Sequence, residues 1–505
     1  MKQVGLVVLV AGVAWGLAGE GIYAQLSAPV KRPNILMIVA DDMNWDSPGC
    51  FGGGADGITP NIDKLATEGM RFLHAYVNIS ICTPSRSVVL TGLYPHRNGA
   101  EGFQRIRPGT PTLPAILNEA GYMCGTVGKP LSQEEIFRWS VAYRWPGAGD
   151  ENRWGRDPAV YRIFCKRFFR LAKTAHQPFF LMASSHDPHH PFGGGRATQE
   201  PNERAAASRA FRAEEVRLPG LLPDLPGVRR EFAAYCTSVR RLDDMAGVVL
   251  DELEKAGLAA ETIVVFLSDH GMPFPGAKFN CYPDSVRTPL IIRWGGKVKR
   301  GAVDRAHMVS MVDLQPTLLE AVGLEPMKSD GYSFLPLLLG ERQEGRDAVF
   351  AQFYHIHGKD ALPMRSVITR DAAYVFNPWS DGERLFTRLG GPAFAAMVKA
   401  AKNDPAMAAR IKYRRLRRVE EFFDLSKDPN CLRNLIGSGD HTAQIKTLRA
   451  KLRKWMAETA DPALEAFDKR DQPEALDQFV ENYRSSAQKV KDALRSYEKR
   501  KGYRF

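Results

Sequence analysis

The sequence has no apolar run long enough to span a membrane. Its longest apolar stretch lies between Val4 and Leu17, whereas a membrane-spanning helix needs roughly 20 apolar residues. It also has no repeat at a fixed period and no long low-complexity tract, which argues against a repeat protein or a largely disordered chain. With 505 residues, 44% of them hydrophobic, the chain can bury a large core and has the length of two or three domains.

Cysteine is scarce. The seven cysteines lie at positions 50, 82, 124, 165, 236, 281 and 431, and no two are spaced as a C-x-x-C pair. This spacing argues against a zinc knuckle and against a disulfide-dense scaffold. Because the count is odd, we expect one cysteine to have a separate role.

The first 24 residues have the pattern of a signal peptide. Lys2 precedes the apolar run, and Ala24 follows it as a small residue at a plausible cleavage point. The alternative, a membrane anchor, is disfavoured because the run is short. We therefore predict a signal peptide over residues 1–24, no stable membrane insertion, and a secreted or periplasmic protein.

The chain carries an excess of positive charge. It has 69 lysine and arginine residues against 57 acidic residues, a net charge of +12, and the stretch from Lys489 to Arg504 is especially basic. This balance favours polyanionic partners, such as sulfated glycans, nucleic acid or acidic surfaces. A solvated basic helix accounts for the tail equally well.

Apolar runs typical of buried strands alternate with helical patterns. The strand-like runs cover residues 34–40, 122–127, 179–183 and 262–267, and the helical patterns cover 59–69, 113–120, 160–171 and 230–255. In the first helix we expect Thr59 as the N-cap, Pro60 in the first turn and Gly69 as the stop. The alternation predicts an α/β fold with a doubly wound sheet flanked by helices.

Polar residues follow two of the predicted strands. Asp41 and Asp42 come directly after residues 34–40, and Asp269 and His270 come just after residues 262–267. Ligands of doubly wound sheets bind at the carboxyl ends of the strands, so we expect the two pairs to converge on one site. A capping or turn role is the default for an isolated Asp-Asp pair, but a pair that ends a buried strand favours a binding site.

The pattern changes after about Arg346. Shorter strand-like pieces at 348–354, 366–369 and 374–377 are followed by charged helical sequence from Pro405 onward. We predict a main domain over residues 31–345, a smaller C-terminal α+β domain over 346–470, and a basic helical tail over 471–505.

The most specific stretch runs from Cys82 to Gly92. Its first five residues, Cys-Thr-Pro-Ser-Arg, resemble the Cys-x-Pro-Ser-Arg signature of the type I sulfatases. Further phrases of that family are Asp41 with Asp42, Gly128 with Lys129, the His-x-Pro-His phrase ending at His189, Ser268-Asp269-His270-Gly271, and Lys278. The chain is identified as a member of this family, and the resemblance implies an alkaline-phosphatase-like mixed sheet.

The resemblance implies a modified nucleophile at Cys82. In the family, a formylglycine-generating enzyme oxidises this cysteine to formylglycine. One hydroxyl of the hydrated aldehyde attacks sulfur to give an enzyme-bound sulfate ester, and loss of a proton from the other expels sulfate and restores the aldehyde. Thiol chemistry at an unmodified Cys82 is the alternative, but no cysteine-protease phrase surrounds it.

The resemblance also assigns roles to charged residues around Cys82. Arg86, one helical turn further on, resembles the arginine that fixes the hydrated aldehyde. Lys129 and Lys278 resemble the two lysines that bind sulfate oxygens.

His189 resembles the family's histidine that protonates the leaving atom. His186 and His190 lie close by, and either of them could enter the pocket instead. In many sulfatases another histidine lies two residues after the lysine matched by Lys129, where this chain has Leu131. That histidine is thought to assist the second hydroxyl of the hydrated aldehyde, so either another residue substitutes for it or turnover is impaired.

The residue types around the site point to calcium. A hard cation prefers oxygen ligands, and clustered carboxylates without nearby cysteines suit calcium better than zinc or copper. Asp41, Asp42 and Asp269 would supply the carboxylates. His270 would fill a fourth position, where family members often have Asn. The ion would also bind the modified Cys82 side chain and a sulfate oxygen, offsetting charge that develops in the transition state.

Several short phrases are similar to the heparan N-sulfatases, or sulfamidases. They are residues 268–275, Asn280, 363–367, 421–425, 428–429 and 434–435. The similarity implies cleavage of sulfate from the amino group of glucosamine, in a pocket for one terminal N-sulfoglucosamine. Arg365, His355 and His357 are possible sugar contacts, although each is more often a structural residue.

Other functions remain open. The enzyme could be an O-sulfatase of another sulfated polysaccharide or an arylsulfatase. A phosphomonoester or phosphodiester hydrolase of the same superfamily usually carries Thr or Ser as nucleophile, so Cys82 argues against it. A non-catalytic sulfated-glycan-binding protein is suggested by Leu131 and the basic tail. In each sulfatase case we expect a sulfated saccharide partner and no nucleic acid.

Overall fold

The computed structural model describes residues 32–129, 134–143, 155–193, 205–356 and 361–501. The predicted signal peptide at residues 1–24, together with Leu131 and His357, lies outside the described residues. The described fold contains a large mixed sheet and a smaller antiparallel sheet.

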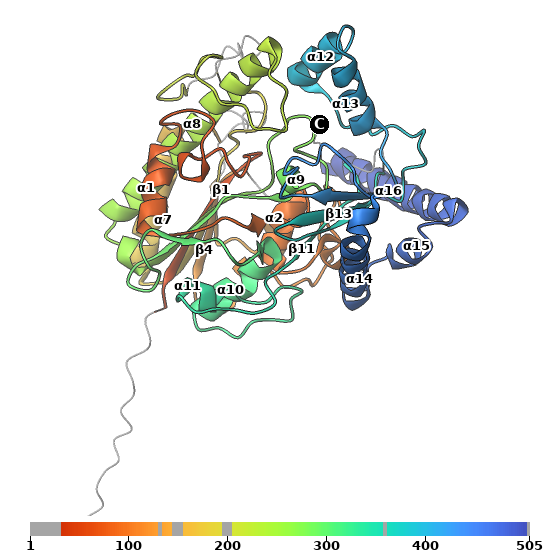
Figure 1. Ribbon diagram of the computed structural model, residues 1–505. Helices are drawn as coiled ribbons and strands as arrows, with labels where there is room; N and C mark the ends of the chain where they lie inside the picture. The colour runs from red at the N-terminus through yellow and green to blue at the C-terminus, as the bar shows by residue number, and fades with distance from the viewer. Residues whose placement is uncertain (1–31, 130–133, 144–154, 194–204, 357–360, 502–505) are drawn as a thin grey trace, which may run out of the picture. The chain divides into compact units, whose positions relative to one another are not determined.

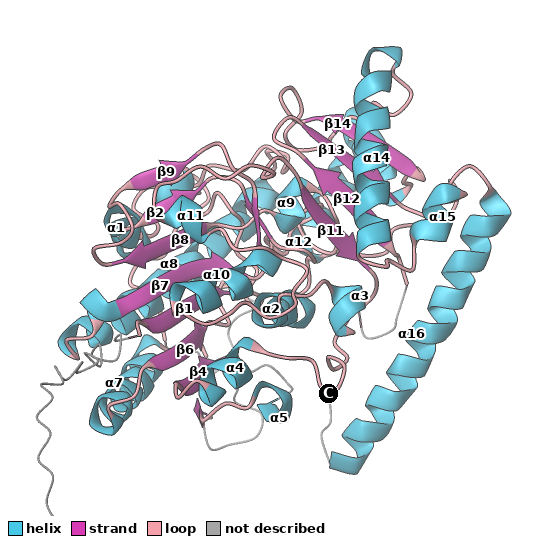
Figure 2. Ribbon diagram, turned by 90° about the horizontal axis from the view of Figure 1, so that it is seen from below, coloured by secondary structure: helices cyan, strands magenta, loops and turns pink. Residues whose placement is uncertain are grey.

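The large sheet has eight strands in the order β5, β4, β6, β1, β7, β8, β2, β9. Figure 2 shows this order from β4 to β9. Strands β5, β4, β6, β1 and β7 run parallel to one another, whereas β8 runs antiparallel to both β7 and β2. The strands are β1 (Asn34–Ala40), β2 (Met70–Phe72), β4 (Met123–Gly128), β5 (Val141–Tyr143), β6 (Phe179–Ser184), β7 (Thr262–Ser268), β8 (Leu290–Trp294) and β9 (Ala302–Asp304). The predicted mixed α/β sheet is confirmed.

Helices cover both faces of this sheet (Figure 1). Alternate residues of β1 belong to two separate hydrophobic clusters, with Ile35 in one and Leu36 in the other. The Leu36 side packs against α1, α7 and α8, and the Ile35 side against α2, α4 and α10. Because both faces are covered, β1 and β7 are continuous apolar runs without a polar side. The helices are α1 (Pro60–Glu68), α2 (Cys82–Thr91), α4 (Leu113–Glu119), α7 (Pro158–Ala175), α8 (Pro226–Lys255) and α10 (Leu314–Ala321).

Two predicted helices are longer in the structure, and one of them is α7, which covers Pro158–Ala175 instead of residues 160–171. Helix α8 begins at Pro226 rather than at Arg230, because proline is well suited to a first helical turn. Thr59 is the N-cap residue of α1 as predicted, although its hydroxyl makes no capping bond and donates to Asp63 instead. Gly69 ends α1 as predicted, and a Cβ there would lie 2.5 Å from the carbonyl oxygen of Ile292.

The smaller sheet is an antiparallel meander in the order β11, β12, β13, β14. Its strands are β11 (Val349–Phe353), β12 (Met364–Ile368), β13 (Ala372–Phe376) and β14 (Glu420–Asp424). One face packs against α14 (Thr442–Glu458) and α15 (Leu464–Asp468), and the other joins the hydrophobic cluster of the large sheet. Strand β14 lies in sequence for which only helix was predicted. Phe422 and Phe423 are fully buried there because the strand pairs with β13.

A helical insertion separates β13 from β14. It contains α12 (Gly391–Ala400) and α13 (Pro405–Arg415). Phe394 and Met407 of this insertion share a hydrophobic cluster with Phe274 and with residues of α8, and α12 packs beside α8 (Figure 1). A segment late in the sequence is therefore packed against the loops that follow β6 and β7.

The last described helix, α16 (Pro473–Lys501), buries Leu476, Val480 and Ala487. Among the described residues, no helix has the length and apolar character needed to cross a membrane. The shorter elements are β3 (Ala75–Tyr76), β10 (Val309–Ser310), α3 (Pro95–Asn98), α5 (Glu134–Phe137), α9 (Pro283–Val286), α11 (Leu335–Leu338) and the 3-10 turns Gly49–Phe51, Ala259–Glu261, Met311–Asp313 and Gly439–His441.

Candidate active site

The acidic pairs that follow β1 and β7 lie side by side. The two strands are parallel neighbours, with Ala40 opposite Ser268, so their carboxyl ends reach the same edge of the sheet. The backbone N–H of Asp42 donates to Asp269 Oδ1 at 3.0 Å. Asp41, Asp42, Asp269 and His270 are all buried. The two pairs therefore converge on one place in the fold, as the sequence predicted.

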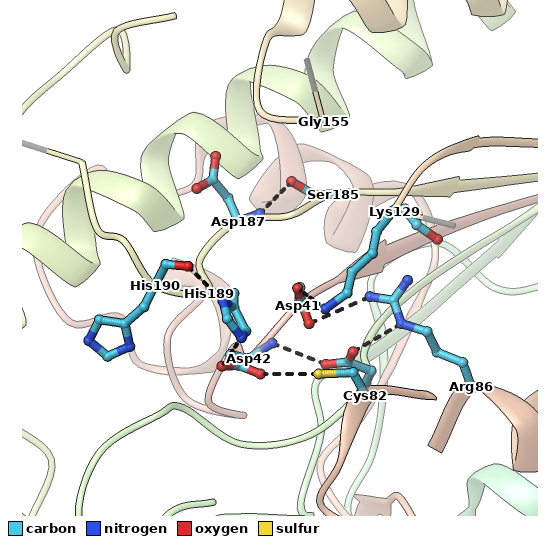
Figure 3. Close-up of polar contacts among 12 residues, drawn as sticks. Asp41, Asp42, Cys82, Arg86, Lys129, Gly155, Ser185, Asp187, His189 and His190 are labelled. Carbon is cyan, nitrogen blue, oxygen red and sulfur yellow. Dashed lines mark hydrogen bonds and ion pairs between the residues drawn. The ribbon is translucent and has the colours of Figure 1, made fainter. Parts of the chain in front are cut away.

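Cys82 is the first residue of α2 and points at these carboxylates (Figure 3). Its Sγ lies 3.4 Å from His270 Nε2 and 3.9 Å from Asp42 Oδ1. Arg86 lies one turn further along α2, and its Nε donates to Asp269 Oδ2 at 3.0 Å. All ten residues of α2 are buried. Some of them face the candidate site, and others, such as Val89 and Leu90, pack in the hydrophobic core.

Three further side chains approach the carboxylates from separate loops. Lys129, just after β4, donates to Asp41. Lys278 Nζ donates to both oxygens of Asp42, at 2.8 and 2.6 Å. His189 Nε2 lies 3.8 Å from Asp42 Oδ2. The residues predicted to be catalytic therefore lie in one cluster, and Figure 3 labels all of them except Lys278.

The donor atoms of the cluster fit a hard cation. Ligand atoms of Asp41, Asp42, Cys82 and His270 all lie within 4.8 Å of one another. Asp41 Oδ1 is buried and accepts no hydrogen bond in the described structure, although Arg86 Nη2 lies 3.8 Å away. This charged oxygen therefore has lone pairs to offer an ion. Asp269 lies beside this group, but its two oxygens accept hydrogen bonds from the Asp42 N–H and from Arg86. Buried carboxylate oxygens suit calcium.

The local charges keep the carboxylates ionised. Burial alone would raise the pKa of Asp41, but Lys129 and other nearby cations hold it well below its ordinary value. Burial opposes ionisation of Asp42 as well, yet the charges of Lys278 and His189 lower its pKa to about 2. Burial raises the pKa of the Cys82 thiol, and the charge of Asp41 adds to this. At neutral pH the site thus holds two carboxylates and a protonated thiol.

The three neighbouring histidines have different surroundings. His189 is partly exposed, and its Nδ1 donates to the carbonyl of His190 at 2.7 Å, which leaves Nε2 facing Asp42. His190 turns away, stacks on Phe192 and contacts Glu231. His186 is buried, and its Nε2 makes no hydrogen bond within the described ranges. Of these three, His189 alone combines contact with the cluster and access from outside.

Asp187 is a residue that sequence reasoning did not single out. Its carboxylate is buried and paired with Arg156 and Arg241, and its carbonyl accepts the N–H of Asp41 at 3.0 Å. It therefore fixes the loop that carries His189 against the end of β1. No local pattern could reveal this, because the two arginines come from distant parts of the chain.

Arg365 is not the sugar contact considered from the sequence. Its side chain is 0% exposed, donates to both oxygens of Asp461 and stacks on Tyr354 at 4.4 Å. His355 is likewise buried. Burial and ion pairing make Arg365 a structural residue.

Replacing Arg365 with Met is expected to lower the free energy of unfolding by about 3–5 kcal/mol, because Asp461 would stay buried without its counter-charge. Urea denaturation of wild type and variant measures the difference. For the folded fraction, kcat/KM should be unchanged. A loss of substrate affinity without a loss of stability would show instead that Arg365 contacts the sugar.

The chain is similar to known sulfatases over most of its length. The family model described as Sulfatase matches residues 33–324, and that described as N-sulphoglucosamine sulphohydrolase, C-terminal, matches residues 276–377. Human N-sulphoglucosamine sulphohydrolase is 30% identical over 473 residues, covering 85% of this chain and 91% of the human protein. An ulvan-active sulfatase of Formosa agariphila is 25% identical, covering 87% of this chain and 77% of that protein.

The fold is shared with solved structures. A structure described as a complex with its substrate D-glucosamine-2-N, 6-O-disulfate has a TM-score of 0.64 and 21% sequence identity, covering 85% of this chain and 99% of that chain.

Proposed function

Because the chain belongs to the sulfatase family, we propose that it removes sulfate from the amino group of N-sulfoglucosamine at the end of a sulfated saccharide. The observation that carries this proposal is the meeting of Asp41, Asp42 and Cys82 with three cationic side chains in one buried cluster. The similarity to human N-sulphoglucosamine sulphohydrolase supports the choice of substrate.

Calcium and formylglycine are part of the proposal. Asp41, Asp42, Asp269 and His270, with the modified Cys82 side chain, would hold the ion. The ion would supply positive charge that offsets the negative charge gained by the sulfate group in the transition state. Formylglycine at position 82 would supply a hydroxyl nucleophile, which a buried protonated thiol does not.

The other side chains would orient the reactants. Arg86 points from α2 toward the carboxylates and would hold the hydrated side chain at position 82. Lys129 pairs with Asp41 and Lys278 pairs with Asp42, and both lysines would bind sulfate oxygens. His189 reaches the cluster from the more exposed side and would give a proton to the leaving nitrogen.

Sulfate release from N-sulfoglucosamine, an O-sulfated monosaccharide and an aryl sulfate tests the proposal. The protein should be co-expressed with a formylglycine-generating enzyme, and mass spectrometry of the Cys82 peptide should establish the modification. We expect the highest kcat/KM with N-sulfoglucosamine. No release by fully modified protein would contradict the activity and favour a sulfated-glycan-binding protein.

A second candidate is an O-sulfatase of another polysaccharide. It is favoured by the similarity to an ulvan-active sulfatase. Preference for the O-sulfated substrate in the same assay would select it over the sulfamidase.

His189 gives a prediction that separates the leaving groups. His189→Gln is expected to lower kcat/KM for the saccharide about 10²-fold, because the leaving nitrogen needs a proton. An aryl sulfate with a nitrophenolate leaving group needs no proton, so its rate should change little. His190→Gln is the matched control, because this neighbour turns away from the cluster.

The pH profile provides an independent check on His189. Burial lowers the pKa of His189 below its ordinary value of 6.5. A proton donor acts in its protonated form, which dominates below its pKa, so kcat/KM for the saccharide should fall as the pH rises through a value below 6.5. His189→Gln should lose this dependence, and a profile identical to that of wild type would assign the proton to another group.

We also propose secretion or periplasmic export after cleavage near Ala24. Amino-terminal sequencing of the mature protein tests this. An intact amino terminus would exclude it.

A further inference from the structure

Lys278, the lysine proposed to bind sulfate, lies in a turn with an unusual backbone. The next residue, Phe279, has a φ of +63°, in the left-handed region that bulky residues rarely adopt. Such a conformation persists only where the surroundings hold the chain on both sides. On one side, Lys278 is fixed through its ammonium group to Asp42. The other side is Asn280.

Asn280 is fully buried and joins two loops of the candidate site. Its backbone N–H donates to Ser80 Oγ at 2.9 Å, and the Ser80 hydroxyl donates back to the Asn280 carbonyl at 2.7 Å. Its side-chain Nδ2 donates to the carbonyl of Lys278 at 2.6 Å. Ser80 lies two residues before Cys82. Asn280 therefore links the segment before Cys82 to the turn that carries Lys278.

Arg417 fixes the orientation of the Asn280 amide. Its Nη2 donates to Asn280 Oδ1 at 2.6 Å. A guanidinium can only donate hydrogen bonds, so the amide must turn its oxygen to Arg417 and its nitrogen to the Lys278 carbonyl. If the Asn280 amide were reversed, its NH2 group would face the Arg417 guanidinium, and both groups can only donate hydrogen bonds.

Arg417 is an uncommon arginine. It is 1% exposed, and its guanidinium lies between the rings of Phe386 and Tyr282, at 4.3 and 4.7 Å. Within the described residues it forms no ion pair with a carboxylate and its Nη1 has no hydrogen-bond partner, while its Nε donates to the carbonyl of Arg414 at 3.4 Å. Neutralisation of a buried carboxylate therefore does not explain why Arg417 is buried. Its short hydrogen bond to Asn280 is a more specific contact.

We propose that Arg417 is a positioning residue for sulfate binding, acting through Asn280 to hold Lys278 at the sulfate site. The inference rests on the proposed role of Lys278 in the proposed function. It assigns part of the active site to the segment between β13 and β14, which lies outside the strands and loops that carry the reacting groups. Without Arg417, the Asn280 amide can reverse, the Lys278 carbonyl loses its donor, and the turn at Phe279 relaxes.

The test measures affinity for inorganic sulfate, which does not require turnover. Isothermal titration of the calcium-loaded, full-length protein should give about a tenfold weaker Kd for Arg417→Met and for Asn280→Leu. The double variant should be no weaker than either single variant, because the two residues act in series. Arg417→Lys keeps a group that can only donate, and it should recover part of the affinity.

A control separates positioning from stability. Arg346 is also buried and stacks on Tyr332 at 3.6 Å, but it pairs with Asp313, outside the catalytic cluster. Arg346→Met should lower the melting temperature and leave the sulfate Kd at the wild-type value. Thermal unfolding of all variants shows which of them are folded at the temperature of the titration.

Two results would overturn the proposal. One is a wild-type sulfate Kd in folded Arg417→Met. The other is an effect in the double variant equal to the product of the single effects, which would mean that Arg417 and Asn280 act independently. If the wild-type protein binds sulfate but releases none from any substrate, only the proposed activity is contradicted, since the affinities still decide the role of Arg417.

Discussion

Cys82→Ala is expected to abolish sulfate release, with kcat falling by at least about 10³-fold, because the variant has no precursor of the nucleophile. The fold should survive, since Cys82 lies at the first position of α2 and Ala is a good helix former. Initial rates with N-sulfoglucosamine, compared with circular dichroism of the same preparation, measure the two effects separately.

Cys124→Ala is the matched control for this variant. Cys124 is also buried, but it lies in β4, and its Sγ contacts the carbonyl of Pro114 outside the cluster. This control should lose some stability and keep its activity. Sulfate release by Cys82→Ala near the wild-type rate would refute the proposed nucleophile.

Asp42→Asn is expected to have an effect of similar size on turnover, because it removes a charged oxygen from the cluster and leaves Lys278 without its partner. It should also remove the response to calcium. In the wild-type protein, calcium at 100 times its Kd should raise the free energy of unfolding by about 2.7 kcal/mol, since the ion binds the folded state alone. Thermal unfolding with calcium and with a chelator measures this difference.

The control for Asp42→Asn is Asp313→Asn, which alters a buried carboxylate paired with Arg346. Its stability should fall, but the increase produced by calcium should remain. Magnesium should stabilise the wild-type protein less than calcium, because it favours a rigid octahedral site and releases water reluctantly. Equal stabilisation of wild type and Asp42→Asn by calcium would exclude Asp42 as a ligand.

Much of the fold followed from local patterns. The buried run at residues 34–40 became β1 with the expected bounds, because a strand covered on both faces must be apolar along its whole length. Strand β14 was missed because it lies close after the charged helix α13, and its strand conformation depends on pairing with β13. Arg365 was considered as a sugar contact because sequence alone does not reveal a buried partner such as Asp461.

The sequence by itself predicted the residues of the candidate site: Asp41, Asp42 and Asp269 at the ends of apolar runs, and Cys82 in a phrase that resembles the family's signature. These patterns are local, because the period of a strand or the cap of a helix is set by residues that are neighbours in the chain. Only the tertiary structure decided how the cluster is held, through Asp187 with its two arginines and through Arg417 with Asn280. Those partners are far apart in sequence, and their meeting depends on how the insertion and the loops pack against a sheet that is already formed.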